Sequence, residues 1–566
     1  MKAKYIFAAL LLTAACTPKV RNLTILTTDD VHGAWFDSTY VGENTRNSIM
    51  AVNYYVDSIR RADGAKNVLL LDAGDCLQGD NASYYYNYVD TVSEHLFSRI
   101  CAYMKYDAVC LGNHDIETGH AVYDRVSREL ASHGIPFMAG NAIRNDNGER
   151  YFPLYKVFKR GGMKVLVLGY DNPNMSSWLD GSLFSGMHFE SLIPLVQKDA
   201  DYLREVFKPD VTIACMHSGT GKGDGTILES QAMDLYKSLR GVDFVVCAHD
   251  HRQVTMHNDS IALINTGSRA RYLGVGKISV GKDGSRSVGS ELIKVDKSKA
   301  DPAMRRTFQK DYEAVKAFTV KEIGVLTQDL YTRDAYKGMC PYINLLQTVQ
   351  MQSTGADISF AAPLTYNGKI SAGVLVFNDL FTIYPYENQL YTLRLTGREV
   401  KNCLEFSYGL WLSEPGGEHT LGIKAGADPR YSQEHWSFEN ASYNFDAAAG
   451  LVYTVDLRKP AGKRINIISM ADGTPFDMDA EYTVAMTSYR ANGGGDHLIK
   501  GAGIPKPELD LRITGRYPEI RECLKAFIER NAGLDPSGFS GKELGSWHFI
   551  PDTKSIESDM ALLFGQ

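Results

Sequence analysis

The sequence predicts a layered α/β domain that a linking helix joins to a smaller α+β domain. Short apolar runs recur from residue 22 to about residue 300 with helix-like segments between them, as buried strands and their crossover helices do. An apolar stripe at helical spacing follows at residues 301–319. Alternating apolar stretches then begin at residue 320. A chain of 566 residues is also too long for a single core.

The first sixteen residues have the pattern of an export signal. Two lysines precede an apolar run, residues 5–15, that is too short to span a bilayer. The run ends in Thr13-Ala14-Ala15-Cys16, which resembles a bacterial lipoprotein cleavage box. We expect residues 1–16 to be a signal peptide, Cys16 to be lipidated, and the protein to be periplasmic or at the cell surface, with its lipid as the only membrane contact. A secretory signal cut nearby is the alternative.

Each of five apolar runs in the predicted α/β domain, residues 17–300, is followed by a cluster of Asp, His, Asn or Gly. In chain order the clusters are Asp30-Val31-His32-Gly33, Gly74-Asp75, Gly112-Asn113-His114-Asp115, His217, and His249-Asp250-His251. Open α/β sheets bind ligands at the carboxyl ends of their strands, where distant parts of the chain meet. We therefore expect these clusters to converge in one crevice.

Seven side chains of these clusters are suited to hold two divalent metal ions. Hydrolysis of a phosphate ester needs a strong nucleophile and neutralised phosphoryl oxygens, and two ions about 3.5–4 Å apart supply both. Mixed nitrogen and oxygen donors suit Zn, Mn, Fe or Co. The expected ligands are Asp30, His32, Asp75, Asn113, His217, His249 and His251. Each one alone is a common turn, cap or core residue, but the joint pattern has no ordinary structural explanation.

The series resembles the calcineurin-like metallophosphoesterases, and among them the bacterial 5′-nucleotidase family with its cyclic-nucleotide relatives. The resemblance covers residues 22 to about 530 and implies a four-layer metallophosphoesterase sandwich. It implies that one metal ion is held by Asp30, His32 and His251. It implies that the other is held by Asn113, His217 and His249, with Asp75 as the bridge.

The same resemblance implies a catalytic histidine. His114 would lie over the phosphate and support departure of the leaving oxygen. In the family an aspartate that orients this histidine usually follows it; here Glu117 occupies that place, with one extra methylene. A carboxylate at this position can still raise the basicity of His114.

The predicted substrate-binding domain, residues 320–530, continues the resemblance through Gly355-Ala356-Asp357-Ile358, Pro385-Tyr386-Glu387-Asn388 and the motif Tyr489–Asp496. In the family, two aromatic rings of this domain clamp the nucleobase by stacking. The resemblance implies Phe445 and Tyr489 for these rings, with Asp496 among the substrate-binding residues. Residues 531–566 are expected to be a C-terminal extension.

One departure from the family bears on the substrate. The family's usual Asn-Gly-Gly-Gly-Ile-Arg segment is replaced by residues 360–367, which contain no arginine. Arginine favours bidentate phosphate contacts, so its loss argues against long phosphate chains. This segment and Tyr443-Asn444-Phe445-Asp446 resemble the 2′,3′-cyclic-nucleotide 2′-phosphodiesterase/3′-nucleotidase branch.

We therefore expect an exported two-metal phosphoesterase that hydrolyses nucleotide phosphate esters. A 5′-nucleotidase on the same scaffold is one alternative. A nucleotide-binding lipoprotein without catalysis is another, although no ligand of the metal set is missing. A structural zinc site is disfavoured because such sites are closed and usually rich in cysteine. The formal net charge of −7 argues against a nucleic-acid polymer as partner, and we expect a monomer.

Overall fold

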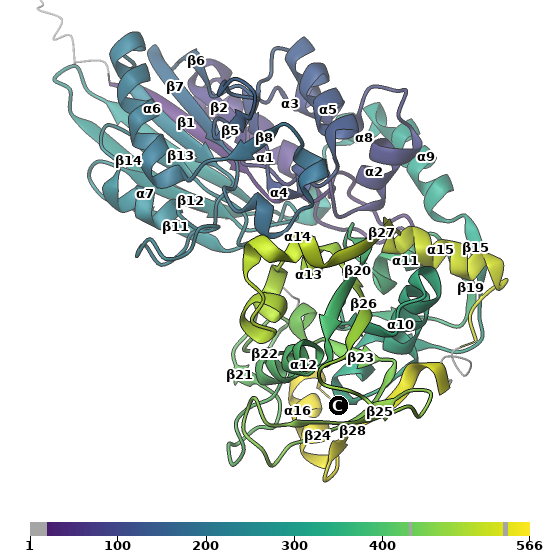
Figure 1. Cartoon of the computed structure of the whole chain (residues 1–566). Coiled ribbons are helices and arrows are strands. Elements are labelled where there is room, and N and C mark those ends of the chain that lie inside the picture. Colours follow the sequence, from purple (N-terminus) through teal and green to yellow (C-terminus); the bar gives the residue numbers. More distant parts are fainter. Residues whose placement is uncertain (1–19, 429–432, 536–541, 566) are drawn as a thin grey trace, which may run out of the picture.

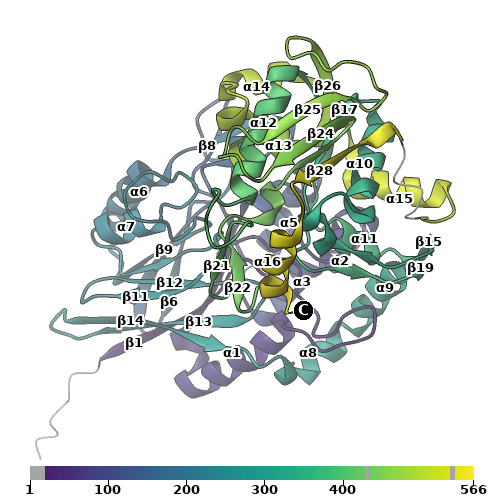
Figure 2. The ribbon, with the colours of Figure 1, turned by 90° about the horizontal axis from the view of Figure 1, so that it is seen from below.

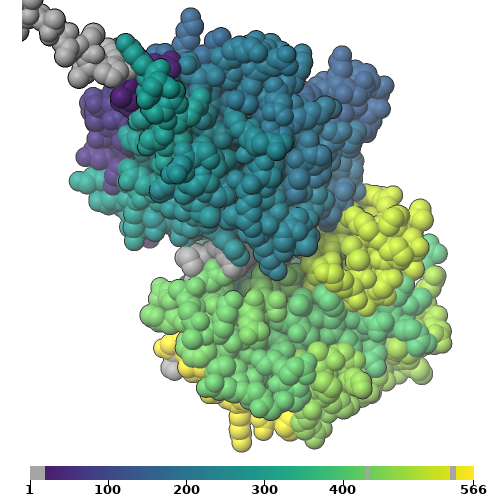
Figure 3. Space-filling view, turned by 90° about the vertical axis from the view of Figure 1, so that its left-hand side faces the viewer, coloured from purple at the N-terminus to yellow at the C-terminus, as the bar shows by residue number. Residues whose placement is uncertain are grey.

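The computed structural model of the protein describes residues 20–428, 433–535 and 542–565. The predicted signal peptide and the predicted lipidation site Cys16 lie outside these residues. The described chain forms two lobes, an N-terminal lobe above a C-terminal lobe in Figure 1, and the surface narrows between them in Figure 3. Among the described helices, none combines enough length with enough apolar character to pass through a bilayer.

Two six-stranded sheets form the centre of the N-terminal lobe (Figure 1). The first has the order β14 (Arg286–Lys294), β13 (Tyr272–Val280), β1 (Arg21–Thr28), β2 (Val68–Asp72), β3 (Ala108–Cys110) and β4 (Phe137–Met138). The second has the order β11 (Gln253–His257), β12 (Ala262–Thr266), β10 (Phe244–Val246), β9 (Val211–Met216), β7 (Met163–Tyr170) and β6 (Tyr155–Arg160). A small pair, β5 (Ala142–Arg144) and β8 (Met187–Phe189), lies apart from both.

Side chains alternate between the two faces of each strand, and this alternation produces four layers. Leu69 and Leu71 of β2 enter the apolar core that also contains residues of the second sheet, whereas Val68 and Leu70 belong to the core under the helices. The helices over the first sheet are α1 (Ile49–Asp63), α3 (Leu96–Met104) and α5 (His120–Ser132). Those over the second are α6 (Leu192–Phe207) and α7 (Ala232–Ser238). The predicted α/β sandwich of four layers is confirmed.

The predicted linking helix is two helices in the structure. They are α8 (Pro302–Thr307) and α9 (Gln309–Thr319), and the backbone of Phe308 between them leaves the helical conformation at φ −103° and ψ 15°. The apolar stripe still packs as expected: Met304, Phe308 and Val315 are buried in the core under the helices of the N-terminal lobe. The ring of Phe308 meets that of Tyr103 at 5.6 Å, so the break keeps this residue in contact with the lobe.

The C-terminal lobe is built on a five-stranded mixed sheet, as the predicted α+β class requires. Its order is β23 (Ala447–Ala449), β17 (Ile358–Ala361), β26 (Glu481–Thr487), β20 (Gln389–Thr396) and β27 (Ile513–Glu519). The main helices are α10 (Pro341–Thr354), α12 (Gly397–Trp411) and α15 (Ile520–Arg530). Short pairs complete the lobe: β15 (Glu322–Leu326) with β19 (Gly373–Val376), β16 (Leu330–Tyr331) with β18 (Lys369–Ile370), and β21 (Ile423–Ala425) with β22 (Trp436–Phe438).

The last segment of the chain is part of the C-terminal lobe rather than an extension from it. Strand β28 (Gly545–Ile550) pairs in parallel with β24 (Leu451–Asp456), whose other neighbour is β25 (Ile465–Met470). Trp547 of β28 stacks on Tyr453 at 5.7 Å in the core of the lobe. Helix α16 (Lys554–Phe564) lies beside β22 (Figure 2).

Candidate metal centre and substrate cleft

The five polar clusters leave the carboxyl ends of parallel strands, as expected. In the first sheet β1, β2 and β3 run parallel, and in the second β9 and β10 do. The loops after β1 and β2 are tied together by two backbone hydrogen bonds, from Asp30 N to the Gly74 carbonyl and from His32 N to the Asp75 carbonyl, both 2.9 Å. Two loops that are distant in sequence therefore present their side chains from one rigid unit.

Five of the seven predicted ligands have a left-handed backbone, which non-glycine residues rarely adopt. The φ values are 45° for Asp30, 49° for His32, 62° for Asp75, 73° for His249 and 54° for His251. Such conformations cost about 1–3 kcal/mol each and persist where the surrounding structure fixes them. Backbone strain is thus concentrated at the residues that the sequence singled out.

One candidate metal site consists of Asp30, His32 and His251. Nε2 of His32 and Nε2 of His251 face each other at 2.9 Å. Oδ1 of Asp30 lies 3.8 Å from Nε2 of His32 and 3.4 Å from Nε2 of His251. Nδ1 of His32 lies 3.3 Å from the Gln78 carbonyl, an arrangement that leaves Nε2 for a metal ion.

The other candidate site consists of Asp75, His217 and His249. Oδ2 of Asp75 lies 3.1 Å from Nε2 of His217, whose Nδ1 contacts the Ala73 carbonyl at 2.8 Å. Asn113 joins this group, since its Oδ1 lies 2.9 Å from Nδ1 of His249. The structure therefore brings the seven predicted ligands together in two groups, and Asp75, which the resemblance implied as the bridge, lies by distance with the second group.

The chemistry of the donors fits cations at both sites. Oδ1 of Asp30 is buried and has no hydrogen-bond partner among the described residues, and Nε2 of His217 is buried with the carboxylate of Asp75 at 3.1 Å but in no well-aligned hydrogen bond. They lie 4.0 Å apart. Unpaired buried polar atoms are costly, and a bound cation is one way to satisfy them. Imidazole, carboxylate and amide donors are the mixture that Zn, Mn, Fe and Co accept.

Burial keeps two of the imidazoles neutral, as metal ligands must be. Burial, followed by repulsion from His251, holds the pKa of His32 well below its ordinary value. Burial and the neighbouring His217 lower the pKa of His249 to about 3. His217 differs: burial disfavours its charged form, but Asp75 and Asp30 outweigh burial and raise its pKa. Positive charge is therefore favoured next to these two carboxylates.

His114 and Glu117 form the pair that the resemblance implied. Nδ1 of His114 lies 2.7 Å from Oε2 of Glu117, and Gln78 donates to the same oxygen at 2.7 Å. Burial opposes the imidazolium, but the carboxylates of Asp75 and Glu117 outweigh burial and raise the pKa of His114 to about 9. Glutamate thus reaches the histidine despite its extra methylene.

Asp115 is a positioning residue whose role the sequence did not indicate. Its carboxylate accepts hydrogen bonds from four backbone amides, those of Asp75, Cys76, Leu77 and Gly112, at 2.8–2.9 Å. Charge-assisted bonds of this kind are the stronger ones in proteins. Asp115 thereby fixes the loop of Asp75 to the loop of Asn113, and both loops supply donors to the second candidate site.

A cleft of about 360 Å³ is lined by four of the seven candidate donors and by residues of both lobes. From the N-terminal lobe it is lined by Asp75, Asn113, His114, His249, His251 and Trp178. Trp178, which no motif indicated, stacks on His249 with ring centroids 5.1 Å apart and an interplanar angle of 26°. From the C-terminal lobe it is lined by Tyr386, Tyr443, Tyr489 and Arg490, among others.

The prediction that Phe445 stacks on the substrate is wrong in this structure. Phe445 is fully buried in the core of its lobe, parallel to Trp411 at 5.6 Å, and does not line the cleft. Tyr443, two residues earlier, lines the cleft instead, and its ring lies 6.3 Å from that of Tyr489 at 90°. The purely apolar ring enters the core, whereas tyrosine suits a cleft because its hydroxyl can stay hydrated.

The other two predicted substrate residues differ in position. Tyr489 lines the cleft as expected. Asp496 does not; it forms an ion pair with Lys500 at 2.7 Å and its side chain is 40% exposed. Arg490 joins the two tyrosine positions, because it donates to the Tyr443 carbonyl at 2.9 Å and lies over the Tyr489 ring at 5.6 Å.

Comparison with known proteins agrees with this architecture. Residues 24–253 match the calcineurin-like phosphoesterase family, and residues 319–500 match the 5′-nucleotidase C-terminal domain. The chain is 22% identical to a 2′,3′-cyclic-nucleotide 2′-phosphodiesterase/3′-nucleotidase of Haemophilus influenzae, over 95% of this chain and 89% of that protein. It is 24% identical to the trifunctional nucleotide phosphoesterase protein YfkN of Bacillus subtilis, over 95% of this chain but only 39% of that protein.

Among solved structures, a putative 5′-nucleotidase from Staphylococcus aureus superposes with a TM-score of 0.78 at 20% identity, covering 93% of this chain and 99% of that one. Together with the two sites, this fold defines a metal-dependent phosphoric ester hydrolase. The chain combines a calcineurin-like phosphoesterase domain with a 5′-nucleotidase C-terminal domain, and curated relatives with which it aligns are named as nucleotide phosphoesterases.

The convergence of the donors makes activity dependent on metal. We expect EDTA treatment to abolish phosphoester hydrolysis, and Mn²⁺, Co²⁺ or Zn²⁺ to restore it. His217→Ala should lower kcat by at least about a hundredfold, as expected for loss of a metal ligand or its support. His257→Ala, an exposed histidine on β11, is the matched control. Unchanged turnover in the metal-free protein, checked by elemental analysis, would contradict the assignment.

Proposed function

We propose that the protein is a 2′,3′-cyclic-nucleotide 2′-phosphodiesterase and 3′-nucleotidase. The observation that carries this proposal is the cationic content of the cleft. Within the described chain, Arg490 is the one arginine that lines it. Its guanidinium already bonds Asp446 at 2.7 Å and the Gly494 carbonyl at 2.6 Å, and its side chain is 5% exposed. Ala361 and Ala362 line the wall where the family usually places glycines and an arginine.

The proposed roles in the metal centre follow the two donor groups. Asp30, His32 and His251 would hold one ion, and Asn113, His217 and His249 the other, with Asp75 between them. Divalent ions bound there supply an acidified water and neutralise the phosphoryl oxygens. The identity of the ions is set by availability as much as by the ligands.

His114 and Glu117 are proposed to act on the leaving group. With Nδ1 of His114 bonded to Glu117, the second nitrogen Nε2 is left to hold a proton. Water adds to phosphorus and loses a proton, the bond from phosphorus to the ribose 2′ oxygen breaks, and that oxygen takes a proton from His114, which the proton released by the water replaces. The product of this first step is a 3′-nucleotide. Repeating the step on its 3′ ester gives a nucleoside and phosphate.

The tyrosine pair is proposed to select nucleotides over other esters. Tyr443 and Tyr489 line the same cleft as the metal centre, so a base placed against them leaves its ribose phosphate near the donors. Stacking tolerates every base because each offers a π face. This wall therefore favours nucleotides as a class rather than one base.

A 5′-nucleotidase is the second candidate, because the S. aureus protein with the same fold bears that name. The two functions are separated by a side-by-side assay of 2′,3′-cyclic AMP, 3′-AMP and 5′-AMP. We expect kcat/KM for the first two to exceed that for 5′-AMP, because residues 360–367 and the loop Tyr443-Asn444-Phe445-Asp446 resemble the cyclic-nucleotide branch. Preferential turnover of 5′-AMP would establish the second candidate instead.

The assignment of the base-binding ring is tested by comparing two aromatic residues. Tyr443→Ala should raise KM for 3′-AMP by about 5- to 100-fold, because base stacking contributes about 1–3 kcal/mol. Hydrolysis of glycerol 2-phosphate, which has no base, should not change. Phe445→Leu is the matched variant: it should lower the unfolding midpoint, because it changes a core ring, and leave KM unchanged. A raised KM in Phe445→Leu together with an unchanged KM in Tyr443→Ala would instead identify Phe445 as the base-binding ring.

We also propose that the protein is exported, anchored by a lipid on Cys16, and monomeric; the sequence pattern of residues 1–16 supports the first two points. Cells fed labelled palmitate should incorporate the label into the wild-type chain and not into Cys16→Ser. The substituted protein should leave the membrane fraction. Label in Cys16→Ser, or a cytoplasmic wild type, would refute the anchor.

A further inference from the structure

The segment between β7 and β8 carries Trp178 into the cleft and also contacts the C-terminal lobe. Met175 and Leu179, on either side of the tryptophan, are buried in the core under the helices of the N-terminal lobe. Trp178 itself is half-buried and stacks on His249. Its indole therefore forms a wall of the cleft beside a residue of the candidate metal centre, with no hydrogen bond of its own to hold it there among the described contacts.

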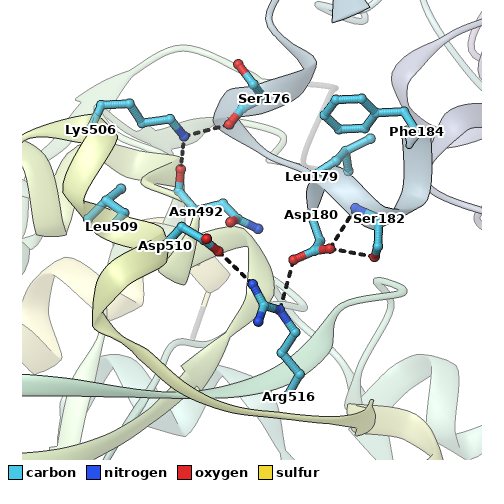
Figure 4. A pocket seen from close by; sticks show the side chains of 11 residues that line it. Ser176, Leu179, Asp180, Ser182, Phe184, Asn492, Lys506, Leu509, Asp510 and Arg516 are labelled. Carbon is cyan, nitrogen blue, oxygen red and sulfur yellow. Dashed lines mark hydrogen bonds and ion pairs between the residues drawn. The ribbon is translucent and has the colours of Figure 1, made fainter. Parts of the chain in front are cut away.

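Two residues of this segment, Ser176 and Asp180, bond across to the other lobe (Figure 4). Each lies two positions from Trp178 in the sequence. Lys506 donates to the Ser176 carbonyl at 2.6 Å. Asp180 accepts from the Tyr391 hydroxyl at 2.8 Å and from Nε of Arg516 at 3.1 Å. Trp178 is thus held between two points of attachment to the C-terminal lobe.

The carboxylate of Asp180 is buried and has several hydrogen-bond partners, unlike that of a surface ion pair. Its side chain is 8% exposed, and it also caps the short helix that follows by accepting from Ser182 N at 2.8 Å. Tyr391 on β20 and Arg516 on β27 are direct cross-strand partners, so both side chains leave the sheet on the same face. The guanidinium lies over the tyrosine ring at 5.3 Å.

The charges at this contact are matched across the two lobes. Burial alone would raise the pKa of Asp180, but hydrogen bonds from Ser182, Tyr391 and Arg516 hold it below its ordinary value. Arg516 is fixed further by Asp510 at 2.6 Å. Burial lowers the pKa of Lys506 to about 8, and its ammonium is satisfied by carbonyls on both lobes, those of Ser176 and Asn492. The carboxylate of Asp180 is buried, whereas the contact between Lys506 and Ser176 is exposed.

We propose that Asp180 and Ser176, bonded to Tyr391, Arg516 and Lys506, form an interlobe latch that positions Trp178 against His249 when the two lobes are docked. Trp178 is then a positioning residue that walls the nucleotide site next to the metal centre. This inference rests on the proposed nucleotide substrate only for its kinetic readout. The latch itself is defined by contacts that do not depend on the substrate.

The first test uses kinetics on the full-length, metal-loaded protein. The variants are Asp180→Asn, Arg516→Gln, their double mutant, Lys506→Met and Trp178→Ala, with Trp178→Phe as the conservative replacement. We expect each of the first five to lower kcat/KM at least about tenfold for whichever of the three AMP esters the wild type prefers, as a misplaced wall would. Glycerol 2-phosphate hydrolysis should fall by a smaller factor than nucleotide hydrolysis, and Trp178→Phe should retain most of the nucleotide activity.

The matched control is Asp479→Asn, which removes an exposed carboxylate that pairs with Arg398 at 2.7 Å within the C-terminal lobe. This substitution should leave kcat/KM unchanged for both the nucleotide and glycerol 2-phosphate. Asp180→Asn and Arg516→Gln should be non-additive, since they remove the same contact. Equal losses for the nucleotide and for glycerol 2-phosphate, or additive effects of the two substitutions, would overturn the latch.

The second test measures Trp178 directly and requires no substrate. The difference in acrylamide quenching between the wild type and Trp178→Phe reports the indole of Trp178. In the Asp180→Asn and Lys506→Met backgrounds we expect this difference to increase, because the indole loses its fixed position on His249. Unchanged quenching with unchanged kinetics would overturn the proposal. Absence of nucleotide turnover in the wild type would contradict only the proposed function, while the quenching result would still decide the latch.

Discussion

The site depends on holding buried carboxylates and imidazoles together at one end of two sheets, although burial keeps His32 and His249 neutral and so leaves the carboxylates short of positive charge. Asp30 and Asp75 are both buried, and burial with repulsion from Asp30 raises the pKa of Asp29 next to them. Burial also raises the pKa of Asp171, which faces His217. Such a cluster is costly in a protein interior unless cations compensate it. The backbone strain at five of its residues points the same way, because only a surrounding structure as ordered as four packed layers can maintain it.

Much of the N-terminal lobe and of the candidate metal centre could be predicted from the sequence because the relevant signals are local. Apolar runs such as Val68–Leu71 mark buried strands, and the polar residues after them carry recognisable chemistry. The linking segment shows the limit of such signals: its apolar stripe is right, but nothing in it indicates the break at Phe308. Strand β28 was missed because its partner β24 lies far away in the sequence, and pairing over such a distance leaves no periodic trace.

The cleft was harder to predict than the metal centre for a related reason. A metal ligand is recognised in a sequence by the donor atom of its side chain, whereas an aromatic ring is equally suited to a core and to the wall of a binding site. The motif around Phe445 identified the correct loop, but burial against Trp411 places the neighbouring Tyr443 in the cleft. Trp178 stands in a segment without any motif and reaches His249 only through tertiary packing. Side-chain direction, not residue type, separates these cases.

The contacts between the lobes differ in kind, and the difference bears on what Asp180 does. On the side of α9 the lobes meet through aromatic rings, including Tyr84 with Phe377 at 5.3 Å and Phe318 with Phe377 at 4.3 Å. Apolar contact of this type is non-directional and tolerates small rotations. The contact at Asp180 is directional, since it works only when one carboxylate meets a hydroxyl and a guanidinium at once.

A buried ion pair is weak support for stability, because desolvation offsets much of the attraction. The better explanation of Asp180 is therefore geometric. The α9 side joins the lobes through rings and through two hydrogen bonds, Asn81 to Asn378 at 2.9 Å and Tyr88 to Glu387 at 3.1 Å, and the contacts at Asp180 add a further directional constraint. With this constraint Trp178 lies on His249 in the cleft that Tyr443 and Tyr489 also line, so the latch at Asp180 and Ser176 sets the shape of the cleft from outside it.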